Sequence, residues 1–362
     1  MRLAVLTQGK TGYLDASLRA LHDRGHDIFV AAPSANDNVA FARLDMDAFA
    51  ECMLFPRNAP PDPIALVSTL HRFAPDVVIM VSWSKPHAFR AAMKARGDNA
   101  LGVLLMDNVW RNTAKQWLGR AGHRVYLDPV FDCVMVPSDR TEFFARRLGF
   151  APNDVIRGCW SADLTRFGAD PCSGETLAAR KRFLSVGRLV HHKGADILAA
   201  AYRVYRSAVT DPWDLVVAGD GPLAGCFDGL AGVTMVGFKQ PAEVADLMRG
   251  ASCFVLPSRE EPYGVVVHEA AASSLPLLCT DFCGATPMFV QDGYNGWVVT
   301  GGSVDALVDG LIRMSASPAE RLEEMSAISK ALSSRLSPHG WAQNVEEEFT
   351  RRLARRRHDA TK

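Results

Sequence analysis

Two glutamates, Glu261 and Glu269, stand in the run Ser258-Arg-Glu-Glu-Pro-Tyr-Gly-Val-Val-Val-His-Glu269 with seven residues between them. The glycine and the apolar stretch after it predict a loop that holds Glu261 and a helix that holds Glu269. Ionised carboxylates only accept hydrogen bonds, so they suit hydroxyl donors. The N-terminus of a helix favours phosphate. The spacing therefore predicts a ligand with hydroxyls at one end and phosphate in the middle.

A second segment, Leu184-Ser-Val-Gly-Arg-Leu-Val-His-His-Lys-Gly194, supplies positive charge. Gly187 permits a turn close to a ligand, and Arg188 and Lys193 place two cations at the mouth of the next helix. Arginine grips phosphate oxygens with two hydrogen bonds and lysine acts as a point charge. The pair could neutralise a diphosphate without a metal, or it could be two basic residues on a surface loop. No cluster in the sequence has metal-ligand spacing, so no metal is expected.

Two further glycine turns follow apolar stretches. The residues concerned are Gly219, Asp220 and Gly221 after one strand, and Val236, Gly237 and Phe238 after the next. Taken alone, each is a tight turn or a plain strand end. In a shared site, the exposed backbone of the second turn would hydrogen-bond the edge of a base.

Short apolar runs alternate with helical patterns in both halves of the chain, which predicts an α/β fold with two doubly wound sheets. The runs are apolar nearly throughout, as in parallel strands covered on both faces. The expected strands are Arg2–Thr7, Asp27–Ala31, Val77–Val81, Leu101–Met106 and Cys133–Val136, then Arg182–Val186, Trp213–Ala218, Thr234–Val236, Cys253–Leu256 and Leu277–Cys279. The expected helices are Tyr13–Arg24, Pro86–Arg96, Arg140–Leu148, Ala195–Ala208, Pro241–Arg249, Val265–Ala272 and Val304–Met314.

The predicted domains are an N-terminal Rossmann-like domain over 1–167 and a second one over 182–338. The polar stretch Gly168-Ala-Asp-Pro-Cys-Ser-Gly174 favours a linker over 168–181. A final helix occupies 339–362. Its basic end, Arg351–Arg357, is either a solvated tail that complements the helix dipole or a contact with an anionic membrane surface.

Composition excludes several classes of protein. With 362 residues the chain is long enough for two cores, and its net charge of +0 gives no case for nucleic acid. The N-terminus is typical of a strand rather than of a signal peptide, and no window reaches the ~18 apolar residues of a membrane span. Several of the eight cysteines lie in apolar strands. These features predict a reduced, cytoplasmic protein.

Taken in order, these segments resemble the donor-binding domain of the GT-B retaining glycosyltransferases, specifically glycosyltransferase family 4 of the group 1 type. The matching strings are "SVGRLVHHKG", "VVAGDGP", "VGF", "FVLPSREEPYGVVVHEAAASSLPLL" and "DGYNGWVV". The resemblance covers the second half well and the first half loosely. It implies two Rossmann-like domains with an interdomain cleft and a last helix that returns to the first domain.

The resemblance also implies roles. Arg188 and Lys193 would bind the donor diphosphate, Glu261 the sugar hydroxyls and Glu269 the ribose. Backbone groups that would face the sugar and phosphate are those of Tyr263, Gly264, Val265 and Val266. The implied reaction is metal-independent, retaining transfer of a sugar from a UDP or GDP donor to an acceptor hydroxyl. Polysaccharide or lipopolysaccharide synthesis at the cell surface is the expected setting.

The first half departs from the family pattern. After Leu101–Met106, Asp107 or Asn108 stands where many relatives have a histidine. Asp107 either contacts the donor sugar or acceptor nucleophile, or is an ordinary turn acid. The loop from Thr7 to Gly12 is similar to the family's glycine loop, with Gly12 expected near the diphosphate.

The stretch Asn108–Tyr126 mixes aromatic and basic residues, which is typical of a membrane interface. It suits a sugar or lipid-linked acceptor and peripheral contact with the inner face of a membrane. Otherwise it is a partly buried helix with a basic face. Two rival functions share the fold: a nucleotide-sugar epimerase or hydrolase, and a non-catalytic nucleotide-sugar-binding subunit. The sequence fixes neither the sugar, base and linkage nor the oligomeric state.

Overall fold

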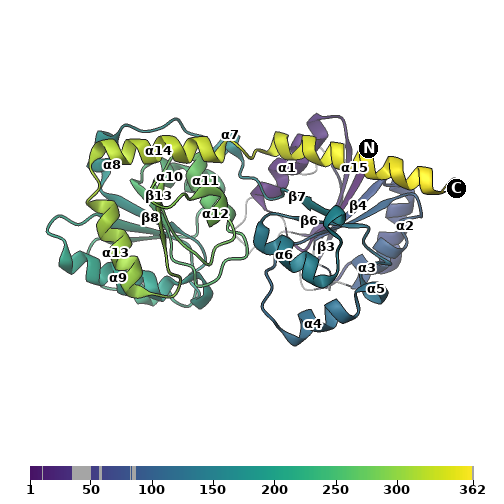
Figure 1. Ribbon diagram of the computed structural model, residues 1–362, viewed down its shortest axis with the longest axis horizontal. Coiled ribbons are helices and arrows are strands. Elements are labelled where there is room, and N and C mark those ends of the chain that lie inside the picture. Colours follow the sequence, from purple (N-terminus) through teal and green to yellow (C-terminus); the bar gives the residue numbers. More distant parts are fainter. Residues whose placement is uncertain (10, 35–49, 57–58, 82, 84–86, 361–362) are drawn as a thin grey trace. The chain divides into compact units, whose positions relative to one another are not determined.

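The computed structural model describes residues 1–9, 11–34, 50–56, 59–81, 83 and 87–360. The chain forms two compact units (Figure 1). Unit 1 comprises Met1–Ser161 and Pro338–Lys362, and unit 2 comprises Ala162–Ser337. Each unit is a parallel sheet with helices on both faces, which confirms the predicted α/β fold class.

The sheet of unit 1 has seven strands within the described ranges, in the order β3-β2-β1-β4-β5-β6-β7. Every neighbouring pair is parallel. The strands are β1 (Arg2–Leu6), β2 (Asp27–Pro33), β3 (Glu51–Phe55), β4 (Val77–Val81), β5 (Leu101–Leu105), β6 (Cys133–Val136) and β7 (Val155–Arg157). The first strand in the chain lies inside the sheet, so the crossovers run in opposite directions from it, as in a doubly wound fold.

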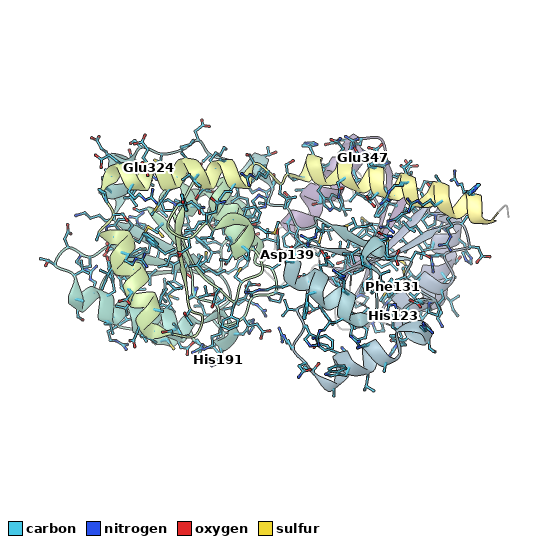
Figure 2. All side chains as sticks on the ribbon, viewed as in Figure 1. His123, Phe131, Asp139, His191, Glu324 and Glu347 are labelled. Carbon is cyan, nitrogen blue, oxygen red and sulfur yellow. The ribbon has the colours of Figure 1, made fainter. Side chains whose placement is uncertain are left out.

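Helices cover both faces of this sheet (Figure 1). They are α1 (Gly12–Asp23), α2 (Pro63–Phe73), α3 (His87–Lys94), α4 (Ala114–Ala121), α5 (His123–Tyr126), α6 (Asp139–Leu148) and α15 (Pro338–Ala360), with a 3-10 turn η2 (Pro152–Asp154). Figure 2 shows Phe131 among the interior side chains of unit 1 and Glu347 on the outer side of α15. The last helix packs against α1, where Arg24 donates to Glu346 at 2.6 Å. It thus returns to the first domain, as the sequence predicted.

The basic end of α15 is part of the packing of unit 1. Arg352 donates to the carbonyl of Asn153 at 2.6 Å, and Arg356 donates to Asp132 at 2.6 Å. The Arg352 side chain is 12% exposed. Arg352 and Arg356 are therefore part of the packing of unit 1, whereas Arg351, Arg355 and Arg357 are exposed, so the solvated tail and the membrane contact both stay predictions.

The sheet of unit 2 has six strands among the described residues, in the order β10-β9-β8-β11-β12-β13. All neighbouring pairs are again parallel. The strands are β8 (Arg182–Val186), β9 (Asp214–Ala218), β10 (Val233–Gly237), β11 (Cys253–Leu256), β12 (Leu277–Thr280) and β13 (Gly296–Val299). The topology of unit 1 is repeated, with β8 in the place of β1.

Four α-helices of unit 2 were not predicted from the sequence: α7, α8, α12 and α14. The full set is α7 (Leu164–Phe167), α8 (Gly174–Arg180), η3 (His191–Lys193), α9 (Ala195–Ala208), η4 (Ala224–Phe227), α10 (Pro241–Arg249), α11 (Val265–Ala272), α12 (Thr286–Phe289), α13 (Val304–Ser315) and α14 (Ala319–Ser333).

The expected linker over 168–181 differs from the structure. Ser173 caps α8 by accepting from the Thr176 N–H, and Leu177 is fully buried in the core of unit 2. The Gly174 N–H donates to Glu323 on α14 at 3.2 Å. The polar, glycine-containing stretch therefore marks a helix start rather than a linker, and the division between the units falls at Ser161 and Ala162.

Candidate functional site

The loops after β8 and β11 meet at the point where the strand order of unit 2 reverses. These strands are neighbours, but the crossover from β8 leads toward β9 and that from β11 toward β12. The two loops therefore diverge and leave the carboxyl ends of both strands accessible. Open α/β sheets bind their ligands at such a switch point. Both the cationic segment and the two-glutamate segment found in the sequence begin here.

Close approach between backbones fixes the loop after β8. A Cβ at Gly219 would lie 1.9 Å from the Gly187 carbonyl oxygen, and Gly219 has a φ of +143°. The Leu189 N–H donates to the Asp220 carbonyl at 2.9 Å. Only glycine fits this backbone conformation and spacing. The loop with Gly187 and the turn with Gly219 and Gly221 thus form one interlocked layer.

Lys193 and Glu261 form an ion pair in this layer. The Lys193 side chain is 22% exposed and that of Glu261 is 9% exposed. Two of the residues singled out in the sequence, 68 positions apart, are therefore in direct contact. The partly buried pair places a donor and an acceptor side by side at the switch point.

A second ion pair, which the sequence analysis missed, holds the same two loops together. Arg259 donates to both carboxylate oxygens of Asp196 at 2.6 Å and to the His191 carbonyl at 2.8 Å. The Glu260 N–H donates to the His192 carbonyl. The hydrogen bonds from Arg259 hold the pKa of Asp196 below its usual value. In the sequence, Arg259 was visible only as a charged residue of the motif. Its partner Asp196 lies 63 positions earlier, on α9.

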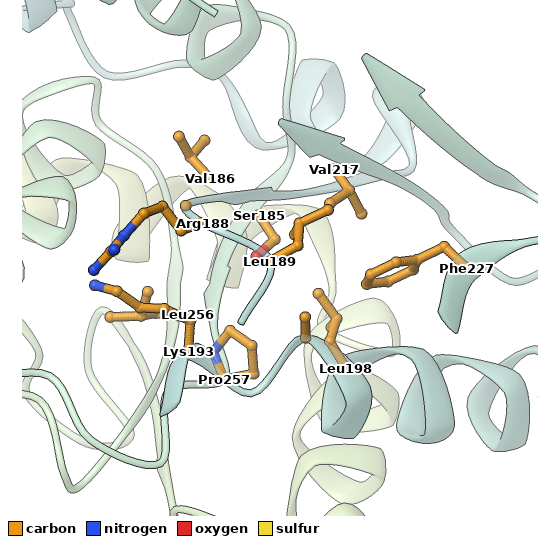
Figure 3. Close-up of a pocket in the computed structure, with 12 residues that line it drawn as sticks. Ser185, Val186, Arg188, Leu189, Lys193, Leu198, Val217, Phe227, Leu256 and Pro257 are labelled. Atoms are coloured by element: carbon orange, nitrogen blue, oxygen red, sulfur yellow. The ribbon is translucent and has the colours of Figure 1, made fainter. Parts of the chain in front are cut away.

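A pocket lies beside Arg188 and Lys193, between β8 and the start of α9 (Figure 3). It contains about 320 Å³ of space that protein atoms do not fill, part of it open to solvent. Figure 3 shows the two cationic ends on one side, with Leu198 and Phe227 toward the other. The pocket therefore has a basic mouth and an apolar interior.

The start of α11 lies next to Glu261. Gly264 caps the helix in the left-handed region with a φ of +86°, and a Cβ there would lie 2.8 Å from both Cys283 Sγ and Glu261 Cγ. Tyr263 is buried, and its carbonyl accepts from the Ala285 N–H at 2.7 Å. The first N–H groups of a helix have no partner within it. Those of Val265 and Val266 thus mark an anion-favouring end beside a carboxylate.

Glu269 lies farther along α11 and is partly buried. Burial raises the pKa of its carboxyl to about 7, although the positive charge of Arg166 opposes the shift. A half-ionised acid near neutral pH can accept hydrogen bonds from hydroxyls once it loses its proton.

The turn after β9 holds the loop after β10. Asp220 accepts from the Phe238 N–H at 2.9 Å through its side chain, and the Gly219 N–H donates to the Gly237 carbonyl at 2.8 Å. Val236 and Gly237 end β10 at this edge. The Asp220 carboxylate therefore supports a neighbouring loop, and the Phe238 N–H, part of the backbone expected to face a base, is already bonded.

The family assignment follows from a comparison with family models. Residues 175–331 match the family described as glycosyl transferases group 1. The second unit therefore carries a group 1 glycosyltransferase domain, and the chain is a glycosyltransferase. The matched range contains every site element of unit 2 described above.

Relatives of this glycosyltransferase act on different sugars. A GDP-mannose-dependent alpha-(1-6)-phosphatidylinositol monomannoside mannosyltransferase from Mycobacterium tuberculosis is 27% identical over 310 residues, which cover 80% of this chain and 73% of the relative. The alpha-D-kanosaminyltransferase of Streptomyces kanamyceticus is 31% identical over 216 residues, covering 57% and 53%. Crystalline Anabaena HepE with UDP and glucose aligns with a TM-score of 0.74 at 16% identity, over 97% of this chain and 99% of HepE. This likeness establishes the GT-B fold.

The candidate residues of unit 1 of the glycosyltransferase lie at the carboxyl edge of its own sheet. Gly12 begins α1 after the loop that follows β1, and Lys10 in that loop lies outside the described residues. Asp107 follows β5 and is partly buried. Burial, followed by the negative charge of Asp107, raises the pKa of the Cys159 thiol, which places Asp107 near the end of β7.

Within the described ranges, no group of three or more His, Cys, Asp or Glu residues is arranged to hold a metal ion. No helix in the same part of the chain is both long and apolar enough to cross a membrane.

Proposed function

We propose that this glycosyltransferase moves a sugar from a UDP or GDP donor to an acceptor hydroxyl with retention of anomeric configuration. The observation that carries the proposal is the Lys193–Glu261 pair beside the start of α11 at the switch point of unit 2. It provides a cation for phosphate and an acceptor for hydroxyls in one place. GDP-mannose in the name of one relative, and UDP with glucose in the HepE crystal, support a nucleotide-sugar donor.

Each residue has a role in this proposal. Arg188 and Lys193 bind the diphosphate, and the N–H groups at the start of α11 complete the anion site. Glu261 accepts from sugar hydroxyls and Glu269 from the ribose. As the bond to the sugar breaks, negative charge grows on the leaving diphosphate, and fixed cations stabilise it. Because two side-chain cations already face this charge, we propose that transfer requires no metal.

Binding and product analysis test the proposal. Wild-type protein in buffer with a chelator is titrated calorimetrically with UDP and with GDP, and turnover is followed with the matching sugar donors. We expect one nucleotide to bind, the R188A/K193A double variant to lose binding, and the product to keep the donor's anomeric configuration. Binding that needs a divalent ion, or an inverted product, would contradict the corresponding part of the proposal. Epimerised or free sugar without acceptor would favour the epimerase or hydrolase.

We further propose that the face formed by α4 and α5 contacts an anionic membrane that carries the acceptor. The chain from 108 to 127 has four basic residues and no acidic one, and Leu118 and Val125 on this face are 73% and 83% exposed. Trp117 is 45% exposed and packs against Trp110 with ring centroids 5.3 Å apart. Positive charge around exposed apolar groups is the pattern of an interfacial surface.

Vesicle co-sedimentation tests this contact. We expect wild-type protein to bind phosphatidylglycerol vesicles at low salt and to dissociate at high salt, because basic side chains attract an anionic surface. The L118E/V125E variant should lose binding. The matched control is I64E on α2, which alters an equally exposed apolar residue of unit 1 and should change nothing. No binding of the wild type at low salt would refute the contact.

A further inference from the structure

His268 occupies a position in α11 directly before Glu269 and is fully buried. Its Nδ1 accepts from the Ala162 N–H at 3.0 Å. Its Nε2 lies 3.0 Å from the carbonyl oxygen of Ser333, which can only accept, so Nε2 carries the proton. The ring also stacks on Phe289, with centroids 4.1 Å apart and planes 10° from parallel. Both ring nitrogens are thus satisfied in a single tautomer.

The two hydrogen-bond partners of His268 lie at the two ends of unit 2. Ala162 is the first residue of the unit, and Ser333 ends α14 just before the unit closes at Ser337. One side chain on α11 therefore bonds to the backbone both where the chain enters unit 2 and close to where it leaves. The helix that carries it also carries the candidate nucleotide site.

The far end of α11 is tied to the same two places. Ser273 donates from its hydroxyl to the Phe167 carbonyl at 3.0 Å, which strengthens the link to the entering chain. Ser326 on α14 donates to the Ser274 carbonyl at 2.7 Å, which strengthens the link to the leaving chain. These serines hold the end of α11, whereas His268 joins its middle to both chain ends.

An apolar side chain would fill the same volume but would leave two backbone groups without partners. Burial lowers the pKa of His268 to about 4, so the ring stays neutral across the physiological range. The link is therefore constant in pH and works through geometry alone. Buried networks whose members are all satisfied hold one arrangement of the elements they join.

We propose that His268 is a positioning residue that couples occupancy of the candidate nucleotide site to both ends of unit 2. The proposal rests on nucleotide binding at α11, as set out above. A nucleotide held by the start of α11 and by Glu269 restrains the helix. Through His268, the same restraint reaches the Ala162 N–H and the Ser333 carbonyl. The chain segments at 162–164 and 333–337 then open less often.

Amide hydrogen exchange with and without the bound nucleotide tests the coupling, with affinity measured by calorimetry. In the wild type, nucleotide should slow exchange at both 162–164 and 333–337. H268L should lose this protection and bind about 5- to 10-fold more weakly, because two hydrogen bonds disappear. H268Q should restore much of both, because a Gln amide offers one acceptor and one donor. S329A is the matched control, since it also removes two buried hydrogen bonds, one to the Leu275 carbonyl and one from the Asn295 amide, and Ser329 is not a hydrogen-bond partner of His268.

The outcomes separate the two proposals. If the wild type binds neither UDP nor GDP, the proposed function fails and the coupling fails with it. If nucleotide binds the wild type but protects neither chain end, the coupling alone is overturned, whatever the variants do. Equal affinity and equal protection in H268L would overturn it as well. Loss of protection in S329A would reduce His268 to a general contributor to the stability of unit 2.

Discussion

Units 1 and 2 share a sheet order and differ in how the loops at the carboxyl ends of their strands are built. In unit 2, backbone contacts at glycines and two ion pairs lock the loops after β8, β9 and β11 together. In unit 1, a Cβ at Gly9 in the loop after β1 would meet nothing within 4 Å, and the loop is held locally by Thr7. The sheet alone does not create a site, because the same topology supports the interlocked layer of unit 2 and, after β1 of unit 1, a loop with room for a side chain at Gly9.

The two kinds of loop suit two kinds of ligand, a constant one and a variable one. A rigid layer holds its groups in fixed positions, which suits recognition of a constant feature such as a diphosphate and ribose. An open loop tolerates change in its residues and in its ligand. On the proposed function, the interlocked layer binds the donor, and the carboxyl edge of the sheet in unit 1 serves the variable partner, the acceptor.

The largest effect is expected from a substitution that disrupts the interlocked layer directly. Gly219→Ala forces a Cβ against the Gly187 carbonyl and strains a residue with positive φ, which should cost about 3 kcal/mol of folding free energy. Thermal unfolding should therefore begin at lower temperature, and nucleotide binding should be lost. Gly9→Ala in unit 1 is the matched change, and it should leave the melting temperature where it was. Equal losses of melting temperature in Gly219→Ala and Gly9→Ala would contradict the difference between the two loops.

The next largest effect is expected from a substitution in unit 1 that lowers turnover but leaves nucleotide binding by unit 2 unchanged. Asp107→Asn removes a charge at the carboxyl edge of unit 1 while keeping the size of the side chain. If Asp107 acts on the acceptor, turnover should fall about 100-fold, a typical loss for a group that moves a proton. Nucleotide affinity by calorimetry should stay within about twofold, less than a typical hydrogen bond is worth. A loss of affinity as large as the loss of turnover would assign Asp107 to donor binding.

A smaller effect concerns the protonation of Glu269 in unit 2. Because its pKa is raised to about 7, the free carboxyl is mostly protonated at pH 6 and ionised at pH 8. The ionised form accepts hydrogen bonds from the ribose, so nucleotide affinity should rise about tenfold between these pH values. Calorimetry at a series of pH values measures this, and Glu269→Gln should flatten the curve.

Glu269→Gln should also change the stability of the fold, and this change is a control for the raised pKa. Burial makes the folded carboxyl hold its proton more tightly than the unfolded one, so Glu269 makes folding less favourable as pH rises from 4.5 to about 7, and the loss then stays constant at higher pH. Glu269→Gln should therefore raise the melting temperature at pH 8, by a margin that shrinks toward pH 5. A lower melting temperature at pH 8 would contradict the raised pKa.

The smallest expected effect tests the clamp between the two loops of unit 2. Arg259→Ala removes the paired hydrogen bonds to Asp196 and releases the segment that carries Lys193. Nucleotide affinity should fall about fivefold, since the pair is partly exposed to solvent. Arg249→Ala removes an exposed ion pair with Asp246 on α10 and should leave affinity unchanged.

Sequence patterns predicted the strands that are buried on both faces. The runs at β4 and β11 are apolar throughout, so their periodicity is clear. Of the four edge strands, β10 was predicted and β3, β7 and β13 were missed; these three have only three to five residues, and each is partly exposed. Helix α14 was missed because serines at Ser326, Ser329 and Ser333 occupy buried positions that a pattern search expects to be apolar.

For the site, the sequence pointed to residue types but not to their contacts. Glu261 and Lys193 were both selected from motifs, yet their pairing depends on two strands lying side by side. Asp220 was selected as a ligand contact, which stays a prediction, and the sequence did not show that its side chain accepts from the Phe238 N–H after the next strand. His268 gave no signal, because its partners are 106 and 65 positions away. Local patterns report neighbours along the chain, whereas these contacts arise from the fold.

The return of α15 to unit 1 sets the order in which the two units can be completed during synthesis. All of unit 2 lies between the two segments of unit 1, so it leaves the ribosome whole before α15 appears. Domains fold as units during synthesis once their residues are available. Unit 1 therefore begins first and finishes last, with the surface of α1 that receives α15 uncovered until the final helix emerges. A chain that ends at Ser337 and has been released from the ribosome would hold a complete unit 2 and an unfinished unit 1.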